Sequence, residues 1–193
     1  MATITAFQNV TLDGVMQAPG RPDEDTRQRF VHGGWSMGYQ DEVSMAFAQE
    51  SMSAPGALLL GWRTYEDLMG FWTGTAESNP FTEVLVNSPK YVVCSSQREL
   101  QWPNSTLLIG KPAEQIDLVR KETDLGITLM GSCALFRALH SAALIDDYVL
   151  QIHPITLGSG RKLFGHGERK NLELVRSVPT GTGVIIAHYR LSR

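Results

Sequence analysis

Short apolar runs that end in glycine restrict the fold of this chain more than any other feature. Residues 57–61 read Ala-Leu-Leu-Leu-Gly, and residues 127–131 read Ile-Thr-Leu-Met-Gly. A continuous apolar run of this length is typical of a parallel strand that is buried on both faces. Each run is followed by residues with helical spacing, and this alternation predicts an α/β fold with a mainly parallel central sheet.

The same alternation continues along the chain. Further strands are predicted over residues 3–10, 90–94, 106–110 and 147–155, and helices over 41–52 and 64–71, from Pro112 and after Ser132. Two late runs, 172–178 and 183–191, have no helix between them and predict an antiparallel hairpin at the C-terminal end. Residues 17–38 are rich in turn residues and form either a functional loop or a floppy insertion.

Composition and charge favour a globular, mildly acidic domain. The chain has 193 residues, of which 42% are hydrophobic and 19% charged, so we expect one domain over residues 1–193. Lys plus Arg number 17 and Asp plus Glu 20, which gives a net charge of −3. We expect no nucleic acid as a partner, because such binding relies on many contacts from Lys and Arg to phosphates.

The sequence carries no sign of a membrane or of an oxidising compartment. No apolar run reaches the roughly 18–20 residues that span a bilayer, and the first residues lack the pattern of a signal peptide. Cys94 and Cys133 are too few and too far apart for a disulfide scaffold. We therefore expect a cytoplasmic protein with two reduced thiols and no membrane contact.

Three of the expected strands end next to small or hydroxyl-bearing residues. Gly61 is followed by Trp62-Arg63-Thr64, Cys94 by Ser95-Ser96, and Gly131 by Ser132. In an open α/β sheet, ligands bind at the carboxyl ends of the strands, and glycine and helix N-termini suit phosphate groups. The pattern predicts a site for a polyphosphate nucleotide. The alternative is structural, with glycines that only end strands and Ser132 as a helix cap.

Other chemistries lack their motifs. Gly158-Ser159-Gly160 has no third glycine of a dinucleotide fingerprint, and the sequence contains no P-loop and no nucleophile elbow. The five histidines show no zinc-binding spacing, so we expect no metal. Cys133 at a helix start would have a lowered pKa, but no base stands near it in the sequence, and a nucleophilic role is not favoured.

Several segments together resemble the dihydrofolate reductase superfamily. Residues 58–66 are similar to its strand–Gly–Arg–x–Thr–aromatic–Glu signature. Residues 11–14 and 144–164 resemble the Ser-Leu-Asp-Gly turn and the Pro-x-x-Leu-Gly-x-Gly-x-x-Leu-Phe segment of the riboflavin-biosynthesis branch. That branch is the reductase (C-terminal) domain of a bifunctional deaminase–reductase. Residues 32–35, His-Gly-Gly-Trp, are similar to a motif of its stand-alone members.

The resemblance implies a dihydrofolate-reductase-like three-layer fold and NADPH as cofactor. Carried over by position, the cofactor-binding residues would be Gly61, Trp62, Arg63, Thr64, Ser95, Ser96, Gly131, Ser132, Cys133 and Ala134. The substrate would meet Asp13, Gly14, Trp35, Leu157 and Gly158. Asp13 is the first candidate for a catalytic polar group, although turn chemistry alone explains an Asp-Gly pair. The loop with Trp35 would close over the nicotinamide, or Trp35 would pack on the core or on a second subunit.

Two departures from the family pattern bear on specificity. Trp62 stands where the family has Arg, so either Arg63 supplies the charge for the 2′-phosphate or Trp62 stacks on adenine. NADH is therefore kept as an alternative cofactor. Dihydrofolate reductases carry a carboxylate that engages the pterin, and here Glu50 is a candidate by helix position only.

The activity implied is an NADPH-dependent reductase. Its substrate would be an aminopyrimidine phosphate whose ribosyl group is reduced to a ribityl group, or another small heterocycle or carbonyl compound. The zinc pattern of a deaminase is missing from the sequence. The alternatives are dihydrofolate reductase activity and a nucleotide-binding protein without turnover. Because the riboflavin branch is commonly dimeric, we also expect a homodimer, with residues 153–164 as the candidate interface.

Overall fold

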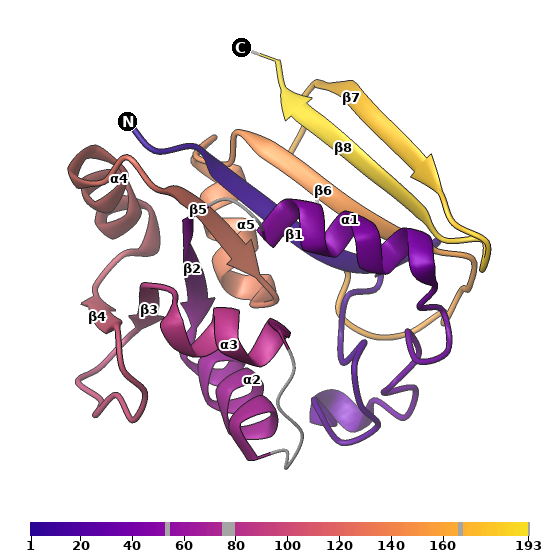
Figure 1. The fold of residues 1–193 in the computed structure, drawn as a ribbon, viewed down its shortest axis with the longest axis horizontal. Helices are drawn as coiled ribbons and strands as arrows, with labels where there is room; N and C mark the ends of the chain where they lie inside the picture. The colour runs from indigo at the N-terminus through magenta and orange to yellow at the C-terminus, as the bar shows by residue number, and fades with distance from the viewer. Residues whose placement is uncertain (53–54, 75–79, 166–167, 193) are drawn as a thin grey trace.

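An eight-stranded sheet forms the centre of the computed structural model, which describes residues 1–52, 55–74, 80–165 and 168–192. The strands are β1 (Ile4–Thr11), β2 (Gly56–Gly61), β3 (Lys90–Cys94), β4 (Ser105–Ile109), β5 (Gly126–Met130), β6 (Asp147–His153), β7 (Leu172–Pro179) and β8 (Ile185–Leu191). Their order is β4-β3-β2-β5-β1-β6-β8-β7 (Figure 1). The six strands from β4 to β6 run parallel, and β8 and β7 form the antiparallel hairpin that was expected.

Helices cover both faces of this sheet. They are α1 (Glu42–Met52), α2 (Trp62–Gly74), α3 (Pro80–Asn87), α4 (Pro112–Glu122) and α5 (Cys133–Ser141), with a short turn of 3-10 helix, η1 (Arg27–Arg29). The side chains of α4 and α5 pack with Leu59, whereas those of α2 and α3 pack with Leu58, which points to the opposite face. Phe7 contacts the cluster of α1, and its neighbour in register, Met130, contacts that of α2, so α1 shares the α2–α3 face.

These layers confirm the predicted three-layer α/β fold. In the described ranges, no helix combines the length and the apolar character needed to cross a membrane.

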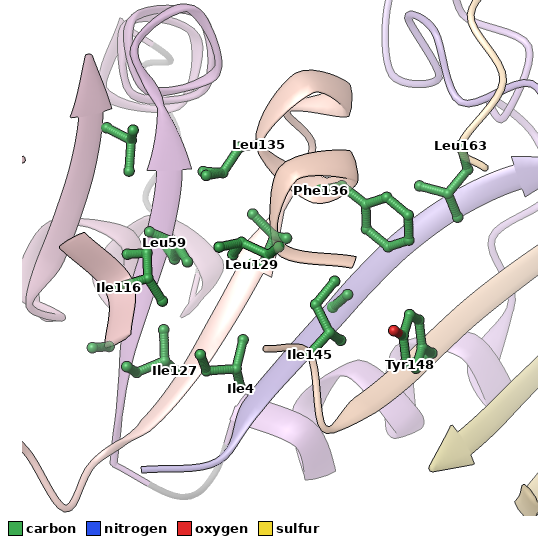
Figure 2. Packing of buried hydrophobic residues seen from close by; sticks show 14 of the residues in the cluster. Ile4, Leu59, Ile116, Ile127, Leu129, Leu135, Phe136, Ile145, Tyr148 and Leu163 are labelled. Carbon is green, nitrogen blue, oxygen red and sulfur yellow. The ribbon is translucent and has the colours of Figure 1, made fainter. Parts of the chain in front are cut away.

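The larger core lies between the sheet and the α4–α5 layer (Figure 2). Ile4, Leu59 and Leu129 come from three neighbouring strands and meet Ile116 of α4 and Phe136 of α5, and each of the five is fully buried. Burial of a side chain of this size contributes about 1.5–3 kcal/mol relative to exposure. This core fixes β1, β2 and β5 relative to one another, and the carboxyl ends of these strands carry the candidate site.

Helix α3 is not predicted by the sequence pattern, and a buried lysine explains how it ends. The helix begins at Pro80 and buries Leu85 against the sheet. The Nζ of Lys90, the first residue of β3, donates hydrogen bonds to the carbonyls of Leu85 (2.8 Å), Val86 (3.0 Å) and Ser88 (2.7 Å). Burial lowers the pKa of Lys90 to about 8. One side chain thus closes the end of α3 and joins it to β3.

Several elements begin or end a few residues away from their predicted bounds. Helix α2 begins at Trp62, immediately after Gly61 ends β2. Strand β6 ends at His153, because the N–H of Ile155 turns back to the carbonyl of His153 at 2.8 Å. Strand β8 begins at Ile185, since the preceding residues form the hairpin turn.

The segment between β1 and α1 is a hydrogen-bonded loop, so it is not a floppy insertion, while its functional role stays a prediction. The side chain of Gln17 is buried and donates to the carbonyls of Asp25 and Arg27, both at 3.1 Å. Its Oε1 accepts a hydrogen bond from the N–H of Arg161 at 3.0 Å. The carbonyl of Gln17 accepts from the Nε1 of Trp35 at 2.7 Å. One glutamine therefore joins both arms of the loop to the segment that follows β6.

The same loop is fastened to helix α2. The Nη2 of Arg21 lies 2.5 Å from Oδ1 of Asp67, and Nη1 lies 3.4 Å from Oδ2. The guanidinium also stacks over the ring of Phe71, with 4.4 Å from Cζ to the ring centroid. The loop thus reaches from β1 to the helix that follows β2.

Candidate functional site

The turns that follow β2 and β5 touch at the carboxyl edge of the sheet. These strands are neighbours, so their ends lie side by side. The hydroxyl of Ser132 accepts a hydrogen bond from the N–H of Gly61 at 2.8 Å and donates one to Oγ1 of Thr64 at 2.7 Å. The structure therefore brings together Gly61, Thr64 and Ser132, which the sequence assigned to cofactor binding. Their role in binding stays a prediction.

The closeness of these turns requires glycine at two positions. A Cβ on Gly61 would lie 2.8 Å from Oγ of Ser132. A Cβ on Gly131 would lie 2.9 Å from Cγ2 of Thr64, and Gly131 also has a left-handed φ of +57°. Real Cβ atoms essentially never come within 3.0 Å of another heavy atom, so a side chain at Gly61 or Gly131 would force Ser132 or Thr64 to shift. Both glycines keep the backbone close to the surface that a ligand would meet.

Ser132 does not cap helix α5, although it occupies the position before it. Its backbone is left-handed, with φ 53°, and its side chain makes no capping hydrogen bond. The hydroxyl instead forms hydrogen bonds with Gly61 and Thr64 in the turn after β2. The interpretation of Ser132 as a helix cap is therefore wrong. The first N–H groups of α5, from Cys133 and the exposed Ala134, have no acceptor inside the helix by its geometry. They suit an anion.

The charges of three arginines act on the thiol of Cys133 at the start of α5. The side chain of Arg137 donates to the carbonyl of Lys162 at 2.5 Å, and the thiol lies 3.4 Å from the same carbonyl. Burial raises the pKa of Cys133, against the opposing charges of Arg137, Arg161 and Arg27. The expectation of a lowered pKa is therefore wrong, and the thiol is protonated at neutral pH. The positive charge found here was missed, because it comes from three separate parts of the sequence.

A second group of polar residues lies at the end of β3. Ser95 and Ser96 are exposed immediately after Cys94. The pKa of the Cys94 thiol is lowered: burial raises it, but hydrogen bonds from the Ser96 N–H, the Arg98 side chain and the Ser96 hydroxyl outweigh burial. Both cysteine thiols of the chain are free. The guanidinium of Arg98, which the sequence analysis did not single out, stacks over the ring of Trp62 with 5.5 Å to its centroid.

Asp13 holds the turn that follows β6. Its Oδ1 accepts hydrogen bonds from the hydroxyl of Thr11 at 2.6 Å and from the N–H of Leu157 at 3.2 Å. Its Oδ2 accepts one from the N–H of Gly158 at 2.8 Å. The hydroxyl of Thr11 and these two N–H groups, against some desolvation, lower the pKa of Asp13. The side chain is an ionised acceptor, an arrangement that favours positioning of the turn over proton donation.

Open space lies in front of this turn. Gly14 and Gly158 have φ values of +82° and +69°, and no described atom lies within 4 Å of a Cβ placed on either. The structure thus brings Asp13, Gly14, Leu157 and Gly158 together, as the substrate prediction requires. Trp35 is 7% exposed and packs in an apolar cluster that includes Leu157, so its ring lies beneath the turn.

A buried histidine lies next to Trp35 and was not recognised from the sequence. His153 is 3% exposed, and its Nε2 lies 3.0 Å from Oδ1 of Asn9. The rings of Trp35 and Tyr39 meet the imidazole edge-on, with centroids 5.1 Å and 5.3 Å away. Burial lowers the pKa of His153 to about 4, so the ring is neutral at physiological pH. Its Nδ1 has no hydrogen-bond partner among the described residues.

Glu50 is not part of the candidate site. It lies on an exposed surface of α1 and accepts two hydrogen bonds, both 3.2 Å, from Nη1 of Arg176 on β7. The position of Glu50 on a helix after the first strand made it a candidate, but the helix presents it to the sheet's outer strand. The structure therefore gives no support to a pterin-binding carboxylate at this residue.

Comparisons with known proteins agree with this fold. Residues 2–186 match the family model described as the RibD C-terminal domain. The chain is 31% identical over 135 residues to the uncharacterized protein YyaP of Bacillus subtilis, an alignment that covers 66% of this chain and 70% of YyaP.

Solved structures share the fold over almost the whole chain. A Shewanella protein whose name assigns it to riboflavin biosynthesis has a TM-score of 0.69 at 20% identity, with 100% of both chains covered. A pyrimidine reductase-like protein of Corynebacterium diphtheriae has a TM-score of 0.66 at 13% identity, covering 100% of this chain and 92% of that one. Dihydrofolate reductase of Enterococcus faecalis, solved with NADP(H) and RAB-propyl, has a TM-score of 0.63 at 18% identity, covering 99% and 97%.

Proposed function

Because the chain belongs to the family of the RibD C-terminal domain, we propose that it is a reductase that uses NADPH to reduce a small heterocyclic or ribosylaminopyrimidine substrate. The observation that carries this proposal is the contact between the turns after β2 and β5. There Gly61, Thr64, Gly131 and Ser132 form a surface of backbone and hydroxyl groups at the carboxyl edge of a parallel sheet. Ligands bind at this edge in open α/β sheets.

The residues at this edge fit a dinucleotide phosphate. Gly61 and Gly131 have no Cβ, so a phosphate can come close to the backbone there. The first N–H groups of α5 suit an anion. Arg137 and Arg161 add positive charge near Cys133, whereas Arg27 is paired with Asp25, in a chain whose net charge is −3. Phosphates carry negative charge, so a local excess of arginine in an acidic protein supports this assignment.

The cofactor would be held by residues from three turns. These residues are Gly61, Trp62, Arg63 and Thr64 after β2, Ser95 and Ser96 after β3, and Gly131, Ser132, Cys133 and Ala134 after β5. When bound, NADPH supplies the hydride, and the protein supplies position and electrostatics. The protein's own part is therefore to hold the nicotinamide and the substrate face to face.

The substrate would lie against the turn held by Asp13. Gly14 and Gly158 leave open space there, and the carboxylate of Asp13 keeps Leu157 and Gly158 in place. Trp35 packs with Leu157 beneath the turn and supports it from the core side. Because the hydrogen bonds of Asp13 lower its pKa, we assign it to positioning and assign the proton of the reduction to a water molecule.

A ribosylaminopyrimidine phosphate is favoured over dihydrofolate. Family membership points to the first substrate. The second would need a carboxylate for the pterin, and Glu50, the residue considered for that role, is paired with Arg176 outside the candidate site. The pocket for the phosphate of the substrate would draw on the same arginine-rich surroundings of α5.

The test is a turnover assay with purified protein. NADPH is mixed with the ribosylaminopyrimidine phosphate or with dihydrofolate, and loss of the reduced cofactor is followed by absorbance. Consumption with the first substrate supports the proposal, and consumption with dihydrofolate alone would replace it with a dihydrofolate reductase. Binding of NADPH with no turnover of either would favour a nucleotide-binding protein. A folded sample that binds no NADPH would overturn the reductase assignment.

A further inference from the structure

A cavity of about 310 Å³ lies at the edge of the sheet opposite the candidate site. Strands β1 and β6 begin at this edge, and β8, which runs antiparallel to β6, ends there (Figure 1). The cavity is therefore separate from the carboxyl edge of the parallel strands. It is lined by residues from four parts of the chain, which are Thr3, Arg120, Asp146, Asp147, Arg190 and Leu191.

Backbone hydrogen bonds hold the wall of this cavity in place. The N–H of Ile4 donates to Oδ2 of Asp146, and the N–H of Asp146 donates to the carbonyl of Ile4, both at 2.9 Å. The carbonyl of Asp146 accepts a bond from the N–H of Leu191 at 2.9 Å. The carbonyl of Arg120 accepts one from the N–H of Ala2 at 2.9 Å. The cavity is thus formed before a ligand arrives, which reduces the entropy lost on binding.

Arg120 is buried in this wall, and the described residues leave a part of its hydrogen-bonding capacity unused. The residue is 7% exposed, and its Nη2 donates to Oδ2 of Asp146 at 3.1 Å and to Oδ1 at 3.4 Å. Its buried Nε has no acceptor among the described residues. A guanidinium carries five N–H donors, and burial of a donor without an acceptor is unfavourable. An acceptor group on a bound molecule would stabilise this guanidinium.

A buried carboxylate lines the same cavity. Asp147 is 6% exposed, and its Oδ1 accepts hydrogen bonds from Nε2 of His188 at 2.9 Å and from Nε of Arg190 at 3.0 Å. Within the described ranges, both of these bonds go to one oxygen, and Oδ2 accepts none. Each oxygen of a carboxylate can accept hydrogen bonds. The second oxygen of Asp147 is therefore free to accept a bond from a donor on a ligand.

The charges that line the cavity balance one another. Arg120 and Arg190 are positive and Asp146 and Asp147 negative, so a ligand of one sign would meet a like charge as well as an opposite one. Like charges brought together weaken binding. A zwitterion suits this lining, because its carboxylate and its ammonium each find an opposite charge. The volume of the cavity is at the lower end of the range for small-molecule sites, which begins at about 300 Å³.

We propose that this cavity binds a free α-amino acid, with its carboxylate on the guanidinium of Arg120 and its ammonium on Asp147. Leu191 lies in the same wall and meets the apolar part of the ligand. The inference does not depend on the reductase activity proposed above, since the two sites lie at opposite edges of the sheet.

Thermal unfolding of the whole chain with added amino acids tests this site. The probes are the common L-amino acids at millimolar concentration and, for the most stabilising of them, its C-terminal amide and its N-acetyl form. We expect one or more amino acids to raise the melting temperature, because a molecule that binds only the folded state stabilises it. The amide lacks the carboxylate and the N-acetyl form lacks the ammonium. Calorimetry should show that each binds at least about tenfold more weakly.

Two variants locate the binding site. Thr3→Phe places a ring in the cavity from the exposed residue before β1, and it leaves every ion pair of the lining in place. Asp147→Asn removes the charge assigned to the ammonium. We expect each variant to weaken binding at least about tenfold. Asp117→Asn, the same change on the surface of α4, is the matched control and should bind as the wild-type protein does.

Three results would overturn the proposal. In the first, no amino acid stabilises the wild-type protein. In the second, the amide or the N-acetyl form binds as tightly as the amino acid, which would indicate a site for a single charge. In the third, binding is unchanged in a folded Thr3→Phe or Asp147→Asn variant, which would place the ligand outside this cavity. Circular dichroism of each variant confirms that it is folded.

Discussion

The Oγ of Ser132 accepts a hydrogen bond from the backbone N–H of Gly61, a residue 71 positions earlier, at 2.8 Å. The bond joins the turn after β2 to the turn after β5 and lies at the centre of the proposed cofactor surface. The same hydroxyl donates to Thr64, so its loss would leave two polar groups without their partner.

Ser132→Ala should lower both stability and cofactor affinity. A partly buried N–H that loses its acceptor costs about 1–3 kcal/mol, and the Thr64 hydroxyl becomes free to rotate. Urea denaturation followed by circular dichroism gives the first quantity, and NADPH titration the second. Ser51→Ala, on the exposed end of α1, is the control and should change neither. A wild-type affinity in Ser132→Ala would mean that the contact is only structural.

Gly131→Ala should be far more damaging than Gly126→Ala. Both glycines belong to the β5 region, but only Gly131 combines a φ of +57° with a Cβ position 2.9 Å from Thr64. A left-handed backbone alone costs a non-glycine residue about 1–2 kcal/mol, and the contact adds to this. No described atom lies within 4 Å of a Cβ on Gly126. Thermal unfolding of the two variants measures the difference, and similar melting temperatures would contradict the close approach.

Asp13→Asn should raise the KM for substrate and leave the shape of the pH profile of kcat unchanged. The amide keeps only one acceptor oxygen and turns an N–H₂ group toward one of the two N–H groups that the carboxylate binds, so the turn at Leu157 loosens. We expect about a tenfold loss in kcat/KM, which corresponds to one weakened charge-assisted bond. Asp124→Asn, at an exposed position, is the control. If the variant lost a limb of the pH profile, Asp13 would be the proton-transfer group.

The buried His153 should make the fold sensitive to mild acid. Burial lowers its pKa in the folded state to about 4, whereas an unfolded histidine titrates near 6.5. Between these values the unfolded state binds more protons, so stability falls as the pH falls through this window, by about 3 kcal/mol in total. Chemical denaturation at a series of pH values measures the slope.

His153→Gln removes this titration, and its stability should fall less steeply in the same window. Burial also lowers the pKa of His140, so a part of the slope remains in the variant. His32→Gln, at an exposed position, should keep the wild-type slope. Equal slopes for the wild-type protein and His153→Gln would show that His153 is not buried and neutral in solution.

Removal of the Arg21 side chain should release the long loop from α2. The contact with Asp67 is partly exposed, and such pairs contribute at most about 1 kcal/mol. Hydrogen–deuterium exchange in residues 17–38 should therefore quicken by a factor of about five in Arg21→Ala, with the exchange of the β-sheet unchanged. Arg169→Ala is the exposed control. Unchanged exchange in the loop would show that the hydrogen bonds of Gln17 hold the loop without the contact between Arg21 and Asp67.

The sequence predicted the sheet because its strands carry a strong local signal. Residues 57–61 are apolar throughout, residues 127–131 are apolar except for Thr128, and both runs end in glycine and belong to strands of the parallel sheet. Helix α3 gave no such signal, since it is short and its end is closed by Lys90 from the next strand. Local propensity does not report a cap that comes from another element.

A part of the candidate site was predicted because it follows directly from the strands. Ends of parallel strands meet by construction, so Gly61 and Ser132 were expected on one edge, and they touch. The stacking of Arg98 on Trp62 joins residues of different turns, and nothing in the spacing of either residue announces it. Asp13 was recognised as a turn residue, but its acceptor role depends on N–H groups that follow 144 and 145 positions later.

The first strand of the chain, β1, lies in the sheet between β5 and β6, which are synthesised much later. β1 pairs with β5 on one side and with β6 on the other, and these end at Met130 and His153. During synthesis, residues 4–11 must wait for about two thirds of the chain to follow before either edge is paired. Contacts so distant in sequence slow folding and leave strand edges open to other chains in the meantime. A ribosome-bound fragment that stops before β5 should therefore need a chaperone, whereas one that extends beyond β8, the partner of β6, should not.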